Sequence, residues 1–335
     1  FKQKTAYEIG VRLVGSEMCI RDSHVGAPTS GSILTQVEFC QFAESIGFSG
    51  VGIADHLEHG HDAYITIAKA LEVTTAIELY TSVTNPVTRH PFTLACLANS
   101  LNELGPGRFK LGIGTGDSSV ANIGVRPATV ARFREVLAEI RQLLSGGSVV
   151  FGTNPDAHIE NPVNPPPSIL VTGSGPKALT TAGEFGDEAM VLAGIPKNLR
   201  ARAFSHIEKG ANSAAKSLDN YKVSHVLSVS IDPDPQEARN RVWPAVFFWV
   251  STGFFNDPIA EMGIELPKLE KPEDASEELK TVLCDTFTIN GTESQVLNRF
   301  HELKDEGLER AYVLAFGGGD SRENMMKLLA KDLLN

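Results

Sequence analysis

Asp55 and His56 place a carboxylate next to an imidazole directly after residues 50–54, which read Gly-Val-Gly-Ile-Ala. This apolar run predicts a short buried strand, so both side chains would lie where the strand ends. A histidine exchanges a proton near neutral pH and a neighbouring carboxylate can orient its ring, so the pair suits general acid–base chemistry. A capping Asp beside a solvated His has the same spacing, and spacing favours neither interpretation. His59 and His61 follow, but without a clear carboxylate pattern around them we predict no metal site.

Residues 79–91 (Leu-Tyr-Thr-Ser-Val-Thr-Asn-Pro-Val-Thr-Arg-His-Pro) are the most distinctive stretch of the chain. They begin as a β-run, pass through an Asn-Pro turn signal and end at Pro91, which is placed to open a helix. A strand, a polar loop and a helix in this order are the unit of an α/β protein, and such loops carry its chemistry. This loop is therefore a candidate part of a ligand site.

A glycine-rich segment, residues 112–117, reads Gly-Ile-Gly-Thr-Gly-Asp and ends another predicted strand. It is not a dinucleotide-binding fingerprint, because Asp117 occupies the place of the third glycine and a long loop follows instead of a helix. We interpret Gly114 and its neighbours as letting a flat ligand approach the backbone, with Asp117 facing that ligand. A plain turn at the end of a strand is the alternative.

Two further turns have the composition of phosphate-binding helix starts. Each combines glycine, a proline at the first helical position and a lysine, and the exposed amides of such a helix start attract anions. Taken singly, each turn also fits an ordinary strand-to-helix connection. The candidate ligands are Gly173, Ser174, Gly175 and Lys177 in the first turn and Gly194 and Lys197 in the second.

Strands and helices alternate along the chain and would bring these loops to one place. Because seven strands are clear and a first one is missing or replaced, we predict a (β/α)₈ TIM barrel rather than an open sheet. Between residues 251 and 281 the pattern dissolves into Gly, Pro and charge, which predicts an irregular insertion or lid before the last strand. The predicted strands are 50–54, 77–83, 108–113, 168–171, 188–192, 223–231 and 311–316.

The first 23 residues do not join smoothly to the rest of the chain. They lack the apolar core and cleavage site of a signal peptide, so we interpret 1–23 as a non-native leader that replaces the natural start. Residues 11–14 imitate a first strand. We expect residues 24–335 to form a single TIM-barrel domain.

Charge and cysteine content narrow the class of ligand. The formal net charge of −11 argues against nucleic acid or an anionic membrane surface as the partner, because the field repels phosphates. No apolar run is long enough to span a bilayer. The cysteines are few, scattered and form no CxxC pair, which is typical of a cytoplasmic protein. A small-molecule substrate is the expected partner.

Together these residues resemble the bacterial luciferase-like superfamily of flavin and deazaflavin oxidoreductases, and within it the methylenetetrahydromethanopterin reductase-like branch. The resemblance rests on residues 54–56, 84–91, 111–117, 175–176, 181–183 and 289–292. It implies a barrel that binds FMN or the deazaflavin coenzyme F420 at its carboxyl-terminal rim, without distinguishing the two.

The resemblance also implies roles for single residues. A non-prolyl cis peptide at Ser82–Val83 would stand behind the cofactor ring, with Thr84 and Asn85 beside it. His56 matches the proposed proton donor, and Asp117 stands where several relatives carry Glu. Relatives commonly dimerise, so a homodimer is implied.

We therefore predict hydride transfer between a reduced deazaflavin or flavin and a small organic substrate. An FMN-dependent monooxygenase supplied by a partner flavin reductase is the alternative, and a non-catalytic flavin-binding protein is a third. The substrate, oxygen dependence and the natural first strand stay open from sequence.

Overall fold

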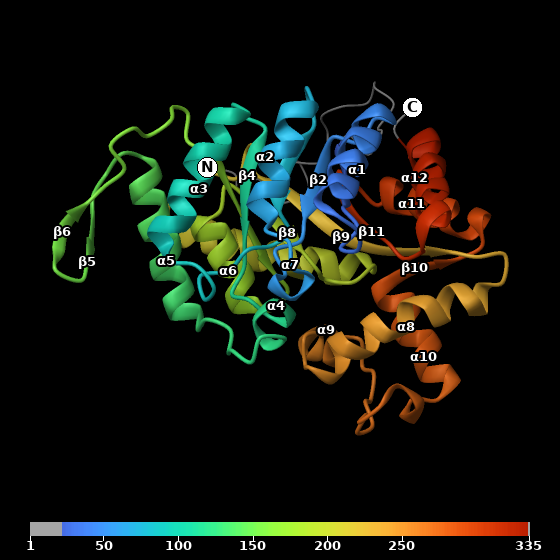
Figure 1. The fold of residues 1–335 in the computed structure, drawn as a ribbon. Helices are drawn as coiled ribbons and strands as arrows, with labels where there is room; N and C mark the ends of the chain where they lie inside the picture. The colour runs from blue at the N-terminus through green and yellow to red at the C-terminus, as the bar shows by residue number, and fades with distance from the viewer. Residues whose placement is uncertain (1–21, 334–335) are drawn as a thin grey trace, which may run out of the picture.

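The computed structural model describes residues 22–333 of the chain. Within that range, eight parallel strands close a barrel and helices surround it (Figure 1), which confirms the predicted (β/α)₈ TIM-barrel fold. The barrel strands are β1 (Asp22–Gly26), β2 (Gly50–Ile53), β3 (Glu78–Thr81), β4 (Phe109–Ile113), β7 (Ser168–Gly173), β8 (Glu188–Val191), β9 (Lys222–Ile231) and β11 (Arg310–Ala315).

The barrel closes through its longest strand. The first part of β9 pairs with β8, its middle part pairs with β11, and β11 pairs with β1. The last part of β9, from Ser228 to Ile231, pairs with a short extra strand, β10 (Thr288–Gly291). All of these pairings are parallel, so every barrel strand ends at the same rim.

Helices follow the strands in the expected order, and apolar side chains of both layers form the core between them. In the described part of the chain, no helix combines the length and the apolar character needed to cross a membrane. The helices are α1 (Ile33–Ser45), α2 (Ala63–Val73), α3 (Pro91–Leu104), α4 (Ser118–Ala121), α5 (Val130–Leu144), α6 (Pro176–Phe185), α7 (Lys197–Ser213), α8 (Pro235–Ser251), α9 (Asn256–Glu261), α10 (Glu277–Phe287), α11 (Glu293–Asp305) and α12 (Gly319–Leu333), with 3₁₀ turns η1 (Leu57–His59) and η2 (Pro272–Asp274).

The first barrel strand starts within the segment that the sequence predicts as a leader. Strand β1 begins at Asp22, so its first two residues lie inside the range 1–23 that the sequence assigns to a leader. The segment 11–14, which imitates a strand, lies outside the described residues. Five residues are enough for β1 because it is paired on both sides, with β2 and with β11.

The insertion around 251–281 is more regular than its composition indicates. It contains α9 and η2 and leads into α10 and β10, neither of which the sequence pattern reveals. Its packing on the flanking helices α8 and α10 explains this order: the Phe255 and Phe287 rings stack with centroids 3.9 Å apart, and Trp243 donates a hydrogen bond to the Pro272 carbonyl over 3.2 Å. Residues 146–167 likewise hold a hairpin, β5 (Val149–Phe151) and β6 (Asn154–Ala157), that projects from the barrel (Figure 1).

A charged network fills the amino-terminal end of the barrel. Lys110 contacts Glu78 at 2.7 Å and Glu188 at 2.6 Å, and Arg310 binds the other side of Glu188 at 2.7 Å. His24 lies 3.3 Å from Glu78. Burial raises the pKa of the Glu78 carboxyl, but His24 and the positive charge of Lys110 outweigh it and bring the pKa to about 2.

We predict that Lys110→Met destabilises the barrel, because two carboxylates lose their shared cation in a buried site. The expected cost is about 3–5 kcal/mol in urea unfolding near neutral pH. Since the folded-state pKa of Glu78 is depressed, its stabilisation is complete above the ordinary pKa of 4.5 and is lost as pH falls toward about 2. In the variant the Glu78 pKa lies closer to its ordinary value, so this loss should be smaller and should end at a higher pH.

The matched control is Lys69→Met, which removes an exposed cation paired with Glu72 at 2.9 Å. It should cost less than about 1 kcal/mol. Equal effects of the two substitutions would contradict a special role for the buried network.

Candidate active site

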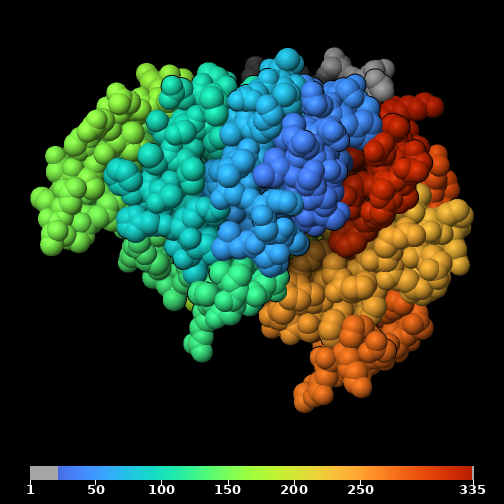
Figure 2. Space-filling view, in the orientation of Figure 1, coloured from blue at the N-terminus to red at the C-terminus, as the bar shows by residue number. Residues whose placement is uncertain are grey.

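The loops that follow β2, β3, β4, β7 and β8 form a continuous arc of the rim, because these strands are neighbours in the barrel. All the residues proposed from sequence to bind or react lie in this arc. Helix α4, in the loop after β4, and helix α9, in the insertion, project at the same end of the molecule (Figure 1), and the surface is hollowed between their regions (Figure 2). The carboxyl rim is thus the candidate active site.

The backbones of the β3 and β4 loops are joined directly. The Thr84 amide donates to the Gly112 carbonyl at 2.9 Å, and the Gly114 amide donates to the Thr84 carbonyl at 3.0 Å. Gly112 allows this approach, since a Cβ there would lie 1.9 Å from the Thr81 carbonyl oxygen. The predicted glycine-rich loop and the predicted Thr-Asn-Pro loop therefore form one unit.

The peptide bond between Ser82 and Val83 is cis, as the family resemblance implies. Val83 lies against Gly114, where an added Cβ would be 3.3 Å from a Val83 methyl. The Ser82 hydroxyl hydrogen-bonds the Tyr312 hydroxyl over 2.7 Å. Burial raises the pKa of Tyr312 to about 12, so this phenol stays protonated. Together these residues form the floor at the centre of the rim.

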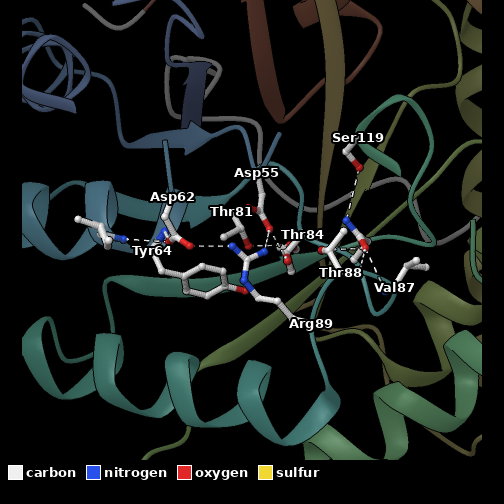
Figure 3. Close-up of polar contacts among 12 residues, drawn as sticks. Asp55, Asp62, Tyr64, Thr81, Thr84, Val87, Thr88, Arg89 and Ser119 are labelled. Atoms are coloured by element: carbon white, nitrogen blue, oxygen red, sulfur yellow. Dashed lines mark hydrogen bonds and ion pairs between the residues drawn. The ribbon is translucent and has the colours of Figure 1, made fainter. Parts of the chain in front are cut away.

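Asp55 is held by a buried ion pair and does not face solvent. Its Oδ2 accepts hydrogen bonds from Arg89 at 2.5 Å and from Thr84 at 2.7 Å (Figure 3), and the residue is 1% exposed. Arg89 also binds Asp62 at 2.9 Å and lies over the Tyr64 ring. Asp55 thus ties the β2 loop to the β3 loop instead of orienting its neighbour His56.

The Asn85 side chain, like that of Asp55, has a structural role. Its side-chain oxygen accepts from the backbone amides of Val87 and Thr88 at 3.0 and 2.9 Å, and its amide group donates to Ser119 at 3.4 Å (Figure 3). This side chain closes the turn and reaches the α4 loop. It is fully buried, so any contact with a cofactor would come from the loop that it shapes.

His56 is half-buried on the rim and is oriented by Glu58. Its Nδ1 lies 2.8 Å from Glu58 Oε1, and its ring stacks on His59 with centroids 5.5 Å apart. The atoms of His56, Glu58 and His59 that could bind a metal ion lie within 4.8 Å of one another. Spacing in the sequence did not single out the Glu58 carboxylate. Glu58 Oε1 also accepts a hydrogen bond from Asn122 at 2.5 Å, so it is already engaged by two protein groups.

Asp117 is exposed at the start of α4, where its carboxylate accepts a hydrogen bond from Ser118 over 3.1 Å. It stands on the rim, in the loop that also contributes Asn122. Its charge is therefore available to a ligand but is not directed by any second element.

The two predicted phosphate-binding turns lie at the starts of α6 and α7. Pro176 is at the first helical position of α6 and Gly175 is its N-cap, without a side-chain cap, while Lys177 and Lys197 are exposed. Gly194 has a different explanation, because it adopts φ 99° and packs against Phe287 of the insertion. The α6 turn is thus the better anion site.

Glu58, Tyr312 and Thr172 are rim residues that sequence reasoning missed. The Thr172 hydroxyl is buried near Gly114 and has no hydrogen-bond partner among the described residues. Strand periodicity was the sequence signal for Thr172. It lies two residues beyond Leu170, whose side chain faces into the barrel, so the Thr172 side chain faces inward as well. No sequence signal marks Tyr312, whose partner Ser82 is distant along the chain.

A barrel with a histidine and a glycine-lined floor on its carboxyl rim is a typical enzyme architecture. The chain belongs to the luciferase-like monooxygenase family, whose model matches residues 18–310. It is thereby an oxidoreductase of the luciferase-like type.

Individual relatives are of several kinds. The 5,10-methylenetetrahydromethanopterin reductase of Methanolobus tindarius is 28% identical over 91% of this chain and 97% of its own length. An F420-dependent glucose-6-phosphate dehydrogenase of Beutenbergia cavernae is 31% identical over 61% of this chain and 67% of that protein.

Solved structures share the fold. The coenzyme F420-dependent tetrahydromethanopterin reductase of Methanopyrus kandleri superposes with a TM-score of 0.77 at 23% identity, covering 94% of this chain and 98% of that one. The FMN-bound oxygenating constituent of a Pseudomonas putida diketocamphane monooxygenase gives 0.67 at 18% identity, over 94% and 98% of the two chains.

We predict that Asp55→Asn lowers stability by about 2–4 kcal/mol, because it leaves the Arg89 charge partly unpaired in a buried position. His56→Ala should change stability by less than about 1 kcal/mol, since that ring is half-buried on the rim. Urea unfolding of both variants checks this. An Asp55→Asn variant as stable as the parent protein but without turnover would instead place Asp55 in the chemistry.

Proposed function

We propose that this protein transfers a hydride between a reduced deazaflavin, coenzyme F420, and a small organic substrate. One observation carries the proposal: Val83, Gly114 and the unpartnered Thr172 hydroxyl lie together as a floor of small and backbone groups on the rim that also carries His56. A flat ring with polar edges fits such a floor, because backbone and glycine leave its face free and a buried hydroxyl can pair with its edge.

The anionic part of such a cofactor fits the start of α6. The helix is ten residues long, its first amides have no side-chain cap, and Lys177 adds a positive charge. Gly173, Ser174 and Gly175 bring the backbone to this point. Lys197, one barrel position further, is a second cation for the same group.

The residues of this chain have distinct tasks in the proposed reaction. When bound, the reduced ring supplies the hydride. His56 holds a proton at Nε2, the ring nitrogen not engaged by Glu58, and gives it to the substrate atom that gains negative charge. Asp55 keeps the β2 and β3 loops together, while Asp117 offers a carboxylate to the substrate from the opposite loop.

We favour F420 over FMN because the full-length relatives and the dehydrogenases matched are named as F420-dependent or as methanopterin reductases. The FMN-dependent monooxygenase remains the second candidate, supported by structural neighbours of that kind. It would require a partner flavin reductase. A flavin-binding protein without turnover is the third.

We further propose a cytoplasmic homodimer. Cys40, Cys96 and Cys284 are free thiols in the described part of the chain, which suits a reducing compartment. The dimer rests on the family resemblance. The substrate is a small organic molecule, and the hollow between the α4 region and the insertion is where it would enter (Figure 2).

His56→Ala should lower turnover by about 10²–10⁴-fold, because the proton then has to come from water. The affinity for the cofactor should change by less than about threefold, since the ring floor is intact. The measurement is oxidation of reduced F420 with a panel of small carbonyl and imine substrates, plus fluorescence titration with F420 and with FMN. Unchanged turnover would remove His56 from the mechanism.

The same titrations test the function as a whole. We expect F420 to bind and oxygen consumption to stay at the level of the protein-free control. Oxygen uptake with reduced FMN would identify the monooxygenase, and binding without turnover the non-catalytic protein. If neither cofactor binds, the proposal is wrong.

Lys177→Gln tests the anion site separately. Loss of one cation at a helix start should weaken cofactor binding by about 5–20-fold while kcat at saturation stays unchanged. Lys69→Gln, the same change on exposed α2, is the control and should have no effect. A fall in kcat without weaker binding would contradict this placement of the phosphate.

A further inference from the structure

We propose that Glu58 is a positioning residue, which fixes the tautomer and direction of His56 and ties this histidine to the α4 loop. The inference rests on the proposed function, in which His56 is the proton donor. Glu58 Oε1 lies 2.8 Å from His56 Nδ1 and accepts a hydrogen bond from Asn122 Nδ2 at 2.5 Å. One carboxylate thus joins the loop after β2 to the loop after β4.

The charge of Glu58 determines which imidazole nitrogen can react. Partial burial raises the pKa of Glu58, but hydrogen bonds from Asn122 and His56 outweigh it and bring the pKa to about 2. The carboxylate is therefore anionic at any working pH, and an anion can only accept a proton from Nδ1. Nε2 is then the nitrogen that carries the transferable proton in the imidazolium and the lone pair after transfer.

The local fold holds this arrangement. His56 caps the 3₁₀ turn η1, which ends at Gly60 with φ 74°, so Glu58 is two residues from His56 on a tight turn. The groups that face His56 are Glu58, the stacked His59 ring from the same turn and, through Glu58, the neutral Asn122 at the end of α4. Glu58 and Asn122 are exposed, so the arrangement rests on the two hydrogen bonds that the Glu58 carboxylate accepts from two different loops.

The position also connects the proton donor to the substrate side of the rim. Asn122 belongs to the same loop as Asp117, the carboxylate that we place near the substrate. A displacement of this loop would therefore move Glu58 and change the direction of His56 Nε2. The loop after β4 thus helps to set the geometry of proton transfer without containing the proton donor.

The test compares Glu58→Gln with Glu72→Gln, which removes an exposed carboxylate paired with Lys69 elsewhere. In histidine-labelled protein, ¹⁵N chemical shifts report which ring nitrogen of His56 is protonated, with His56→Ala identifying the signal. Glu58→Gln should lose the Nδ1–H preference, because a side-chain amide can donate to Nδ1 as well as accept from it. The control should match the parent protein.

Activity gives the second measurement. In Glu58→Gln, kcat should fall about 10-fold with cofactor affinity unchanged. Asn122→Ala keeps the charge but removes the anchor, so kcat should fall less and the Nδ1–H preference should remain. This separates the loss of orientation from the loss of charge.

Identical His56 signals in the parent protein and Glu58→Gln would overturn the proposal. So would a change of the His56 signals on adding EDTA to the parent protein, because Glu58 would then be a metal ligand with His56 and His59. The NMR comparison needs no cofactor or turnover. A failure of the proposed function, seen as absence of F420 and FMN binding, is thus distinguishable from a failure of this inference.

Discussion

The buried carboxylate of Asp55 is the interaction on which the rim depends. It binds Arg89 and Thr84, and Arg89 in turn binds Asp62 at the start of α2. A carboxylate taken out of water needs such partners, because an unpaired buried charge is strongly destabilising. The β2 loop and the β3 loop are consequently held in one arrangement, and that arrangement places His56 and the Ser82–Val83 peptide on the same rim.

The second constraint is the close contact of β3 with β4. Gly112 admits the Thr81 carbonyl at a distance that no side chain would allow, and the Thr84 and Gly114 amides then complete a backbone ladder beyond the ends of the strands. This ladder turns separate loops into a continuous floor. The charged network at the opposite end of the barrel needs no ligand, because its acids and bases are paired with one another. The chemistry is thus concentrated at one end.

Relatives and structural neighbours of this chain are named as reductases, dehydrogenases and monooxygenases, and the structural neighbours share its fold. In this chain the rim also carries the α4 loop, with Asp117 and Asn122, and the insertion, which packs on α10 through Phe255 and Phe287. A floor formed by backbone serves any flat cofactor. The α4 loop and the insertion border the hollow seen in Figure 2.

The sequence by itself determined the barrel, seven of its strands and the loops that line the site, because local periodicity and turn residues decide these features. It also indicated His56 and the helix start at Pro176 through residues that are adjacent in the chain, while the cis bond at Ser82–Val83 was implied by the family resemblance. Only the tertiary structure decided what each side chain contacts. Asp55 binds Arg89 instead of orienting His56, Glu58 reaches Asn122 across the rim, and Tyr312 meets Ser82 from the far end of the chain. Such pairings depend on barrel closure, which brings residues together over sequence separations that no local pattern encodes. The first strand shows the same limit, since β1 is stabilised by two neighbouring strands more than by its own residues.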